Sequence, residues 1–431
     1  MVDGGEFSGL NVPESCVRIE RWITDSKGAD SMTRKIGSVL AGMAVAGMAA
    51  ISVSAVEIKI PAPGADSAAP LLTLKVYGYI KLDAAYDTQK TSAGDLLYYV
   101  LPKVNGESDN EFNMAARETR LGLALAGPDI ESLKTTGKIE VDFYGGNTAN
   151  SPNLRLRLAY VDMVMPSGTA VRAGQDWETF MTVIPKTVNF AIMADSGALG
   201  LRRPQFRVTQ DIPLYDKTKL VAKVAAARTI GQDIDGGMQD DGADSGYPSV
   251  QYNVCLETTL LTAKTTKLSV SGHWGNETLD SDVSNVDVDT DVKDYNTWSM
   301  IGSLFLPLHQ KVTIQGTVWQ GKNLDTYYGG IGQGINKTLQ QGIGARGGYL
   351  QLITDLTDRL NWNLAYGIDD PDNQDLNDGN RSKNQTVLTS VYYKITSAVT
   401  AAFEYYYMTT SYKGQSAASD NRFQGAMIYK F

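Results

Sequence analysis

The chain contains very little cysteine and histidine. It has two residues of each type among 431, and the cysteines are Cys16 and Cys255. Cys16 lies upstream of a predicted export signal, so Cys255 stands alone in the mature chain and no disulfide framework can form. The scarcity of histidine counts against a hydrolase. Stability is therefore expected to come from closed backbone pairing rather than from covalent links.

Charged residues and long apolar runs are also scarce. Only 20% of the residues are charged, the formal net charge is −9, and a single uncharged apolar span occurs, at 36–52. The acidic balance argues against nucleic acid as a partner. Glycine (42 residues) and tyrosine (22 residues) are abundant instead. This composition suits strands that are apolar on one face and polar on the other, as in a barrel with a wet interior.

The N-terminal part of the chain has the pattern of an export signal. Met32-Thr-Arg-Lys35 supplies positive charge, the apolar span follows, and Val53-Ser-Ala55 fits a small-residue cleavage site. A membrane anchor is the alternative, although a segment so rich in Gly and Ala is only weakly apolar. The predicted boundaries are 1–31 for an upstream gene-start extension, 32–55 for a signal peptide, 56–70 for a short N-terminal linker and 71–431 for a transmembrane β-barrel.

The last nine residues, 423–431, alternate between apolar and polar side chains and end on an aromatic residue. A free strand of this kind invites aggregation in a soluble protein, whereas the closing strand of a barrel is paired with the first strand. Tyr429 and Phe431 lie on the apolar row. They resemble the signal that the bacterial outer-membrane assembly machinery reads, which makes that machinery an expected partner. The alternative is a chance alternation at the end of a secreted β-sandwich.

Turn-forming residues recur along the chain and give a strand count. Seven short breaks alternate with eight longer segments rich in Gly, Asp and Asn, and these fifteen connections imply sixteen strands. The fold class is therefore all-β, a 16-stranded antiparallel transmembrane barrel with short periplasmic turns and long extracellular loops. The short turns are expected at 127–132, 166–168, 213–217, 261–266, 307–310, 354–358 and 396–397. The long loops are expected at 88–116, 145–153, 176–204, 230–248, 276–296, 322–342, 368–384 and 410–420.

Arginines alternate with apolar residues in several of these strands. In the run 154–160, the leucines and Tyr160 share one face, and Arg155 and Arg157 share the other. A charged side chain costs about 2–4 kcal/mol at the middle of the membrane, so the arginines are expected to face the lumen and the leucines and Tyr160 the lipid. The same parity places three more arginines in the lumen, namely Arg120, Arg172 and Arg207.

Five motifs between residues 117 and 210 occur in the order and spacing seen in DcaP-like porins. They are Glu118-Thr-Arg-Leu-Gly122, Gly137-Lys-Ile-Glu-Val-Asp-Phe-Tyr-Gly-Gly146, Leu154-Arg-Leu-Arg-Leu-Ala-Tyr160, Gly174-Gln-Asp-Trp-Glu-Thr-Phe180 and Arg202-Arg-Pro-Gln-Phe-Arg207. The chain resembles this family over about the first half of the barrel. The resemblance implies a homotrimer in a Gram-negative outer membrane that admits small organic anions such as dicarboxylates. Members often carry a coiled-coil segment before the barrel, whereas this chain has a short Pro-containing stretch.

The third long loop, 176–204, is unusually apolar for an exposed loop and contains Trp177, Phe180 and Phe190. By resemblance to general porins, we predict that it enters the barrel and narrows it; a lid on the outer rim or on a neighbouring subunit is the alternative. An arginine cluster beside it is expected to line one wall and bind anions, with Glu140, Asp142, Asp176 and Glu178 opposite. Pairing with those carboxylates is the alternative role of each arginine. The predicted constriction arginines are Arg120, Arg155, Arg157, Arg172, Arg202, Arg203 and Arg207.

Together these patterns predict an outer-membrane porin, a water-filled diffusion channel for small, preferentially anionic organic solutes, rather than an enzyme. The expected partners are outer-membrane lipid, two further copies of the chain, the assembly machinery and small organic anions. We expect no catalytic residue, cofactor or metal.

Two other function classes remain open. A barrel hydrolase would use His273, which lies on a lumen row beside Ser271, but no aligned nucleophile motif or carboxylate accompanies it. A structural barrel or adhesin would need a plugged lumen, although sixteen strands enclose a channel that wall side chains alone cannot fill. The glycine-rich run 329–334 lacks the Lys-Ser/Thr of a phosphate loop and is interpreted as a flexible outer loop.

Overall fold

The computed structural model describes residues 57–61, 71–127, 132–146, 151–231, 241–279 and 293–431. The predicted gene-start extension, 1–31, and signal peptide, 32–55, lie outside the described residues. The predicted linker contains strand β1 (Glu57–Pro61), which pairs antiparallel with the first barrel strand. No helix in the described ranges is long and apolar enough to cross a membrane.

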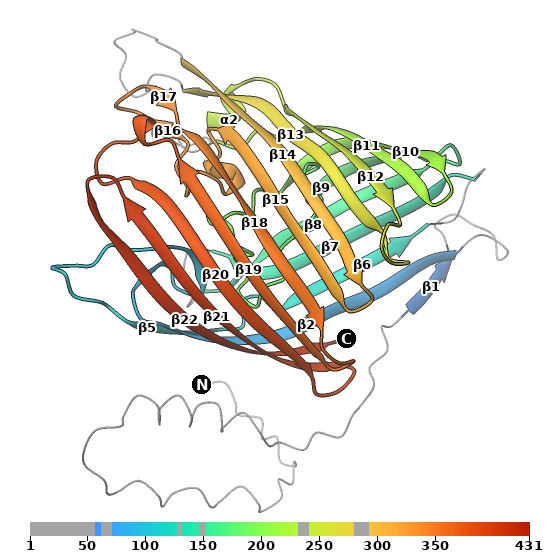
Figure 1. Cartoon of the computed structure of the whole chain (residues 1–431). Helices are drawn as coiled ribbons and strands as arrows, with labels where there is room; N and C mark the ends of the chain where they lie inside the picture. Colours follow the sequence, from blue (N-terminus) through green and yellow to red (C-terminus); the bar gives the residue numbers. More distant parts are fainter. Residues whose placement is uncertain (1–56, 62–70, 128–131, 147–150, 232–240, 280–292) are drawn as a thin grey trace, which may run out of the picture. The chain divides into compact units, whose positions relative to one another are not determined.

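Antiparallel strands wind into a closed barrel (Figure 1). Strand β22 returns to pair with β2, with Tyr429 opposite Ile80, so the predicted closing strand is confirmed. Strands β5 and β6 both pair with β2 and act as one interrupted strand. Counted in this way, the described residues form the sixteen barrel strands that the turn pattern predicts.

Most barrel strands have ten or more residues, which is enough to cross the hydrocarbon core of a membrane when the strand is tilted. The strands of the first half are β2 (Leu71–Asp87), β5 (Glu111–Ala115), β6 (Arg120–Ala126), β7 (Lys134–Gly145), β8 (Asn153–Val164), β9 (Thr169–Trp177), β10 (Arg202–Tyr215), β11 (Thr218–Ala227) and β12 (Ser249–Thr258). Those of the second half are β13 (Thr266–Leu279), β14 (Lys293–His309), β15 (Val312–Lys322), β18 (Gly344–Asp355), β19 (Leu360–Pro371), β20 (Arg381–Lys394), β21 (Val399–Tyr412) and β22 (Gln415–Lys430). One short helix, α2 (Asp241–Asp244), lies between β11 and β12.

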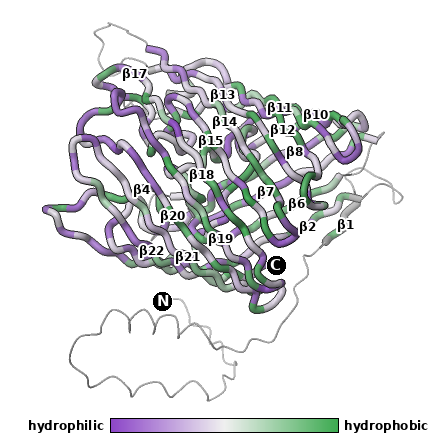
Figure 2. The backbone as a smooth tube through the Cα atoms, in the orientation of Figure 1, coloured by the Kyte–Doolittle hydropathy of each residue, from purple (hydrophilic) through white to green (hydrophobic). Residues whose placement is uncertain are grey.

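Side chains alternate between a lipid-facing and a lumen-facing row along the strands. In β12, Val250 and Val254 are 45% and 44% exposed, whereas Gln251 and Asn253 are buried. Figure 2 shows apolar residues along the strands and hydrophilic residues around the loops near β17 (Gln341–Gly342). Cys255 of the same strand is a buried free thiol. The lumen-facing rows are polar because they meet inward-folded loops and water rather than lipid.

The predicted alternation fails beyond Arg157. Glu140 of β7 lies opposite Leu158, but the next residue, Val141, lies opposite Leu156, so Arg157 is the extra residue of a β-bulge. Leu156 is 47% exposed and faces lipid as predicted, whereas Leu158 is 5% exposed and faces the lumen. The prediction is therefore wrong for Leu158 and Tyr160, because a bulge reverses a period-two pattern.

The prediction of an eighth long loop at 410–420 is also wrong. Strands β21 and β22 are joined by Lys413 and Gly414 alone, and Gly414 adopts the left-handed conformation (φ 71°) of a tight hairpin. Thr409 and Ser419, polar residues that favour a loop in the sequence, bond across the hairpin at 2.9 Å between their hydroxyl oxygens. Cross-strand hydroxyl pairs stabilise polar strands beyond the membrane.

Candidate functional site

The segment 178–201, which joins β9 to β10, folds into the barrel. Midway along it, Glu404 of β21 accepts hydrogen bonds from the backbone N–H groups of Val188 and Asn189 at 2.8 and 2.7 Å. Further side chains on lumen-facing rows bond to its backbone along its length: Gln251 to Thr179, Ser271 to Phe180, Gln315 to Ile184, Gln351 to Lys186 and Trp319 to Gly197. The third loop thus enters the barrel, as predicted, rather than lying on the outer rim.

Two further segments fold inward that the sequence patterns did not indicate. One is the hairpin of β3 (Thr91–Ala93) and β4 (Leu96–Val100). The other is 323–343, which carries the 3-10 helix η2 (Asp325–Tyr327) and the short strands β16 (Ile335–Asn336) and β17 (Gln341–Gly342). The interpretation of its glycine-rich run as a flexible outer loop is wrong, because Ile331 is fully buried and Asp369 accepts bonds from the N–H groups of Gly330 and Ile331 at 3.2 Å. Its apolar residues, Leu324, Tyr327, Tyr328 and Ile331, are the signal that could have identified it.

A cavity of about 380 Å³ lies between the third loop and one side of the barrel wall. Four predicted arginines, Arg120, Arg155, Arg157 and Arg202, converge on it, and Glu118 is the one carboxylate in its described lining. Aromatic rings complete the enclosure: Tyr79 from β2, Tyr98 from β4, Trp177, Phe190 and Tyr328. Tyr98 and Tyr328 are stacked with ring centroids 5.5 Å apart, so the hairpin and the segment 323–343 meet at this cavity.

Two of these arginines are held by carboxylates on the neighbouring strand. Arg155 bonds Asp142 through two nitrogens, Nε to Oδ1 at 3.0 Å and Nη2 to Oδ2 at 2.8 Å. Arg157 donates from Nε to Glu140 at 2.8 Å and from Nη1 to Asp142 at 2.9 Å. The prediction that these carboxylates lie opposite the arginines is therefore wrong. Strand register places them on the same wall, where they fix the guanidinium groups in position.

Arg202 differs from its neighbours. Its side chain is buried at 8% exposure, and its guanidinium carbon lies 4.8 Å from the centre of the Trp177 ring. Within the described ranges it forms no ion pair, and its Nη1 has no hydrogen-bond partner. A buried guanidinium with an unsatisfied N–H is costly unless an acceptor reaches it, so the cavity is suited to an anionic group.

Positive charges outnumber negative charges around the cavity. The cations are the four arginines, Lys81, which pairs with Glu118 and, at 3.2 Å, with Asp83, and Lys138, which lies 3.9 Å from Glu140. Four carboxylates face them: Asp83, Glu118, Glu140 and Asp142. Each of these carboxylates contacts at least one of the other cations, whereas Arg202 has no ion pair among the described residues.

The other three predicted arginines do not line this cavity. Arg172 and Arg207 both pair with Asp176, the latter at 3.1 Å, and Arg172 also lies 3.7 Å from the ring centre of Tyr160. Arg203 is fully buried and pairs with Glu178. Its nitrogens also donate to the backbone carbonyls of Arg228 and Thr326, so it ties the loops together. The prediction of a single seven-arginine wall is wrong, because nearby carboxylates already neutralise these three.

Of the three aromatic residues predicted to form the constriction loop, two line the cavity and one does not. Trp177 and Phe190 line the cavity, and Phe190 stacks on Tyr144 with centroids 5.0 Å apart. Phe180 is 1% exposed and packs instead in an apolar cluster with Tyr327 and Trp319. Apolar composition indicates that a loop will be buried, but it does not indicate which side chain faces the cavity.

His273 is held in place by two hydroxyl groups and an aromatic ring. Its ring nitrogens lie 2.7 Å from Ser299 Oγ and 3.0 Å from Thr297 Oγ1, and its ring stacks on Tyr327 with centroids 3.9 Å apart. Ser271 donates its hydroxyl to the carbonyl of Phe180 at 2.9 Å. In the part of the chain that the structure describes, no carboxylate completes a catalytic arrangement with this histidine.

Asp195, in the third loop, is a buried acid with a raised pKa. Its Oδ1 has no hydrogen-bond partner among the described residues. Burial raises the pKa of Asp195 to about 7, and the nearby positive charge of Arg381 offsets only part of this effect. Asp195 therefore becomes charged at a higher pH than an exposed aspartate does.

The comparisons with known proteins define a fold class. No protein-family model and no curated protein matches the chain. Among solved structures, the DcaP outer membrane channel of Acinetobacter baumannii matches with a TM-score of 0.66 at 19% identity, covering 84% of this chain and 97% of that one. An anion-selective porin from Comamonas acidovorans matches with a TM-score of 0.54 at 13% identity, covering 84% and 100%. OmpT of Vibrio cholerae in its trimer form matches with a TM-score of 0.52 at 12% identity, covering 84% and 99%.

These similarities show that the chain has the fold of the outer-membrane porins. The match to DcaP agrees with the family resemblance of the sequence motifs.

Proposed function

We propose that the protein is an outer-membrane porin, a water-filled diffusion channel for small, preferentially anionic organic solutes. The observation that carries this proposal is Arg202, a buried guanidinium without an ion pair in the described residues, which faces a cavity lined by three other arginines. The names of two similar structures, an outer membrane channel and an anion-selective porin, point in the same direction.

The geometry suggests how such a solute would pass. A carboxylate entering the cavity would accept hydrogen bonds from Arg202 in place of water, while Arg155 and Arg157 stay held by Asp142 and Glu140. The surrounding rings offer apolar contact to the rest of the solute. Because one arginine without an ion pair attracts the anion, binding would be strong enough for selection and weak enough for release, as conduction requires.

The proposal includes assembly and export. We propose a homotrimer, supported by the family resemblance and by the trimer form of the similar Vibrio cholerae protein. Native mass spectrometry of the purified protein would show three chains, and conductance steps would come in groups of three. We also propose a cleaved signal peptide over 32–55, so the N-terminal sequence of protein isolated from outer membranes is expected to begin near Val56.

The decisive experiment replaces Arg202→Gln, which keeps polar N–H groups but removes the charge. A unit charge about 4 Å away contributes ~1 kcal/mol even in water, so the anion-to-cation permeability ratio should fall roughly fivefold. Reversal potentials in planar bilayers under a salt gradient measure this ratio. Arg359→Gln, on an exposed turn, makes the same charge change away from the cavity and should leave the ratio unchanged. An equal ratio in the Arg202→Gln and wild-type channels would refute the proposed selectivity.

A further inference from the structure

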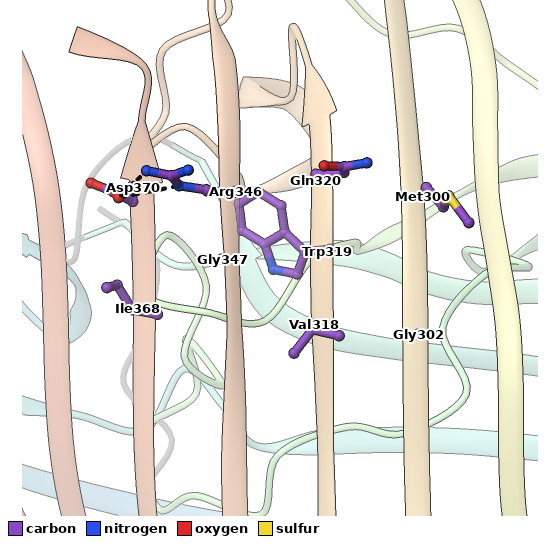
Figure 3. Close-up of a pocket in the computed structure, with 9 residues that line it drawn as sticks. All are labelled: Met300, Gly302, Val318, Trp319, Gln320, Arg346, Gly347, Ile368 and Asp370. Carbon is purple, nitrogen blue, oxygen red and sulfur yellow. Dashed lines mark hydrogen bonds and ion pairs between the residues drawn. The ribbon is translucent and has the colours of Figure 1, made fainter.

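A groove of about 540 Å³ lies on the lipid-facing side of β14, β15, β18 and β19 (Figure 3). Val318 stands at its centre, 70% exposed, and its two strand neighbours at the same level are Gly302 and Gly348. Because glycine has no side chain, a hollow lies on each side of the valine. Ile368 of β19 borders one hollow, and Met300 lies two residues from Gly302 on β14, at the end of the other.

One end of the groove carries exposed positive charge. Arg346 and Asp370 lie there, joined at 3.4 Å, as Figure 3 shows. Lys383 of the next strand contacts the same carboxylate at 3.5 Å. The side chains of Arg346 and Lys383 are 71% and 41% exposed, so two solvent-accessible cations share one acid at long distances. This rim lies near the ends of the strands from which the long connections 323–343 and 372–380 emerge.

We propose that the groove binds a phosphorylated, multiply acylated lipid of the outer leaflet. One acyl chain would lie beside Val318, and a phosphate would be bound by Arg346 and Lys383. The inference rests on the proposed function, because it requires the barrel to lie in an outer membrane with its long loops outward. Guanidinium and ammonium groups at the membrane interface are the groups that recognise lipid phosphates.

Two features favour a lipid over a second copy of the chain. A shallow hollow lies on each side of a single protruding valine, a shape that fits a flexible hydrocarbon chain. The rim presents two exposed cations, Arg346 and Lys383, around Asp370, and these cations complement a phosphate better than they complement the same two cations of another copy.

The test fills the hollow without disturbing the barrel. A Cβ added at Gly302 would meet only the Val318 side chain, at an ordinary contact distance of 3.6 Å, so Gly302→Leu should fold. Gly425→Leu is the matched control, since a Cβ at that lipid-facing position of β22 meets nothing within 4 Å. Each protein would be placed in nanodiscs containing bisphosphorylated lipid A, and the lipid retained after gentle release would be counted by native mass spectrometry. Retention of lipid A should fall roughly tenfold in Gly302→Leu, because the leucine would occupy the space of the acyl chain. It should stay at the wild-type level in the control.

A second variant tests the head-group site. Arg346→Gln with Lys383→Gln should abolish the preference for bisphosphorylated over dephosphorylated lipid A. Equal retention by Gly302→Leu and Gly425→Leu, or an unchanged phosphate preference in the double variant, would overturn the proposal. The proposal would also be overturned if the wild-type protein retained no lipid A and the Gly302→Leu protein dissociated into monomers. That pair of results would show that the groove is a subunit interface. Conductance recorded on the same preparations separates the two proposals, since a conducting protein without bound lipid A refutes only the lipid site.

Discussion

Arg157 Nη1 lies 2.9 Å from Asp142 Oδ2, and the two side chains are 1% and 0% exposed. Such a pair stabilises the site only as a complete unit, because either partner alone is a buried charge. The same guanidinium also reaches Glu140, so one residue, added by a bulge, joins two carboxylates of the adjacent strand. The wall of the cavity is therefore an ion network rather than a row of free cations.

We predict that Arg157→Met lowers the free energy of unfolding by about 3–5 kcal/mol, because Glu140 and Asp142 each lose a partner in a buried site. Urea unfolding of the barrel in detergent measures the change. Adding Glu140→Gln and Asp142→Asn to the same chain should restore part of the stability, since neutral amides no longer need a cation. A triple variant as unstable as Arg157→Met would show that shape, not charge, dominates.

Glu404 is predicted to hold the middle of the third loop. It accepts the N–H groups of Val188 and Asn189, and a bond to a charged acceptor contributes about 1.5–3 kcal/mol. Glu404→Ala should therefore loosen the loop and raise single-channel conductance with more frequent fluctuations. Glu404→Gln keeps one acceptor oxygen and should give an intermediate conductance. Unaltered conductance in the alanine variant would mean that the other loop anchors suffice.

Stability should depend on pH through Asp195. Its pKa is about 7 in the folded chain and lies near its ordinary low value in the unfolded chain, so the folded state holds an extra proton between those values. Unfolding free energy is thus expected to decrease as pH rises from about 4 to 7, by up to ~4 kcal/mol, and to level off above that. Asp195→Asn should remove the part of this decrease that Asp195 causes, as measured by urea titrations at a series of pH values. The same slope in both proteins would place its origin in other groups.

Phe431 ends the closing strand and exchanges two backbone hydrogen bonds of 3.2 Å with Gly78. Its deletion removes little buried area, so the finished barrel should lose at most a few kcal/mol. We predict less folded protein in the outer membrane, whereas protein refolded in detergent keeps nearly normal heat resistance on gels. Phe431→Ala, which retains both backbone bonds, should show the same cellular defect. Normal outer-membrane levels of the deletion variant would contradict the assembly-signal hypothesis.

The barrel was predictable from the sequence because its rules are local. Alternation and turn residues recur in every strand, and pairing of the terminal strand follows from the need to leave no open edge. Local rules fail where tertiary contacts decide. The bulge at Arg157 reverses the row that contains Leu158, and a single Gly414 turns a predicted loop into a hairpin.

The site was predicted less well because its residues are sorted by partners that are distant in the sequence. Arg202 and Arg203 are adjacent and chemically identical, yet one faces the cavity and the other is neutralised by Glu178. Likewise Tyr98 and Tyr328 meet only because two separate segments fold inward. No spacing in the sequence encodes these encounters.

The third loop has a consequence for the order of folding. Val188 accepts a bond from Lys81 near the start of the barrel, and its own N–H donates to Glu404 near the end. The loop can therefore reach its final position only when the earliest and latest strands are already neighbours. Contacts of such high sequence separation form late, because much chain entropy must be lost first. Docking of this loop should thus report completion of the cylinder, and the selective passage would be built after the wall that surrounds it.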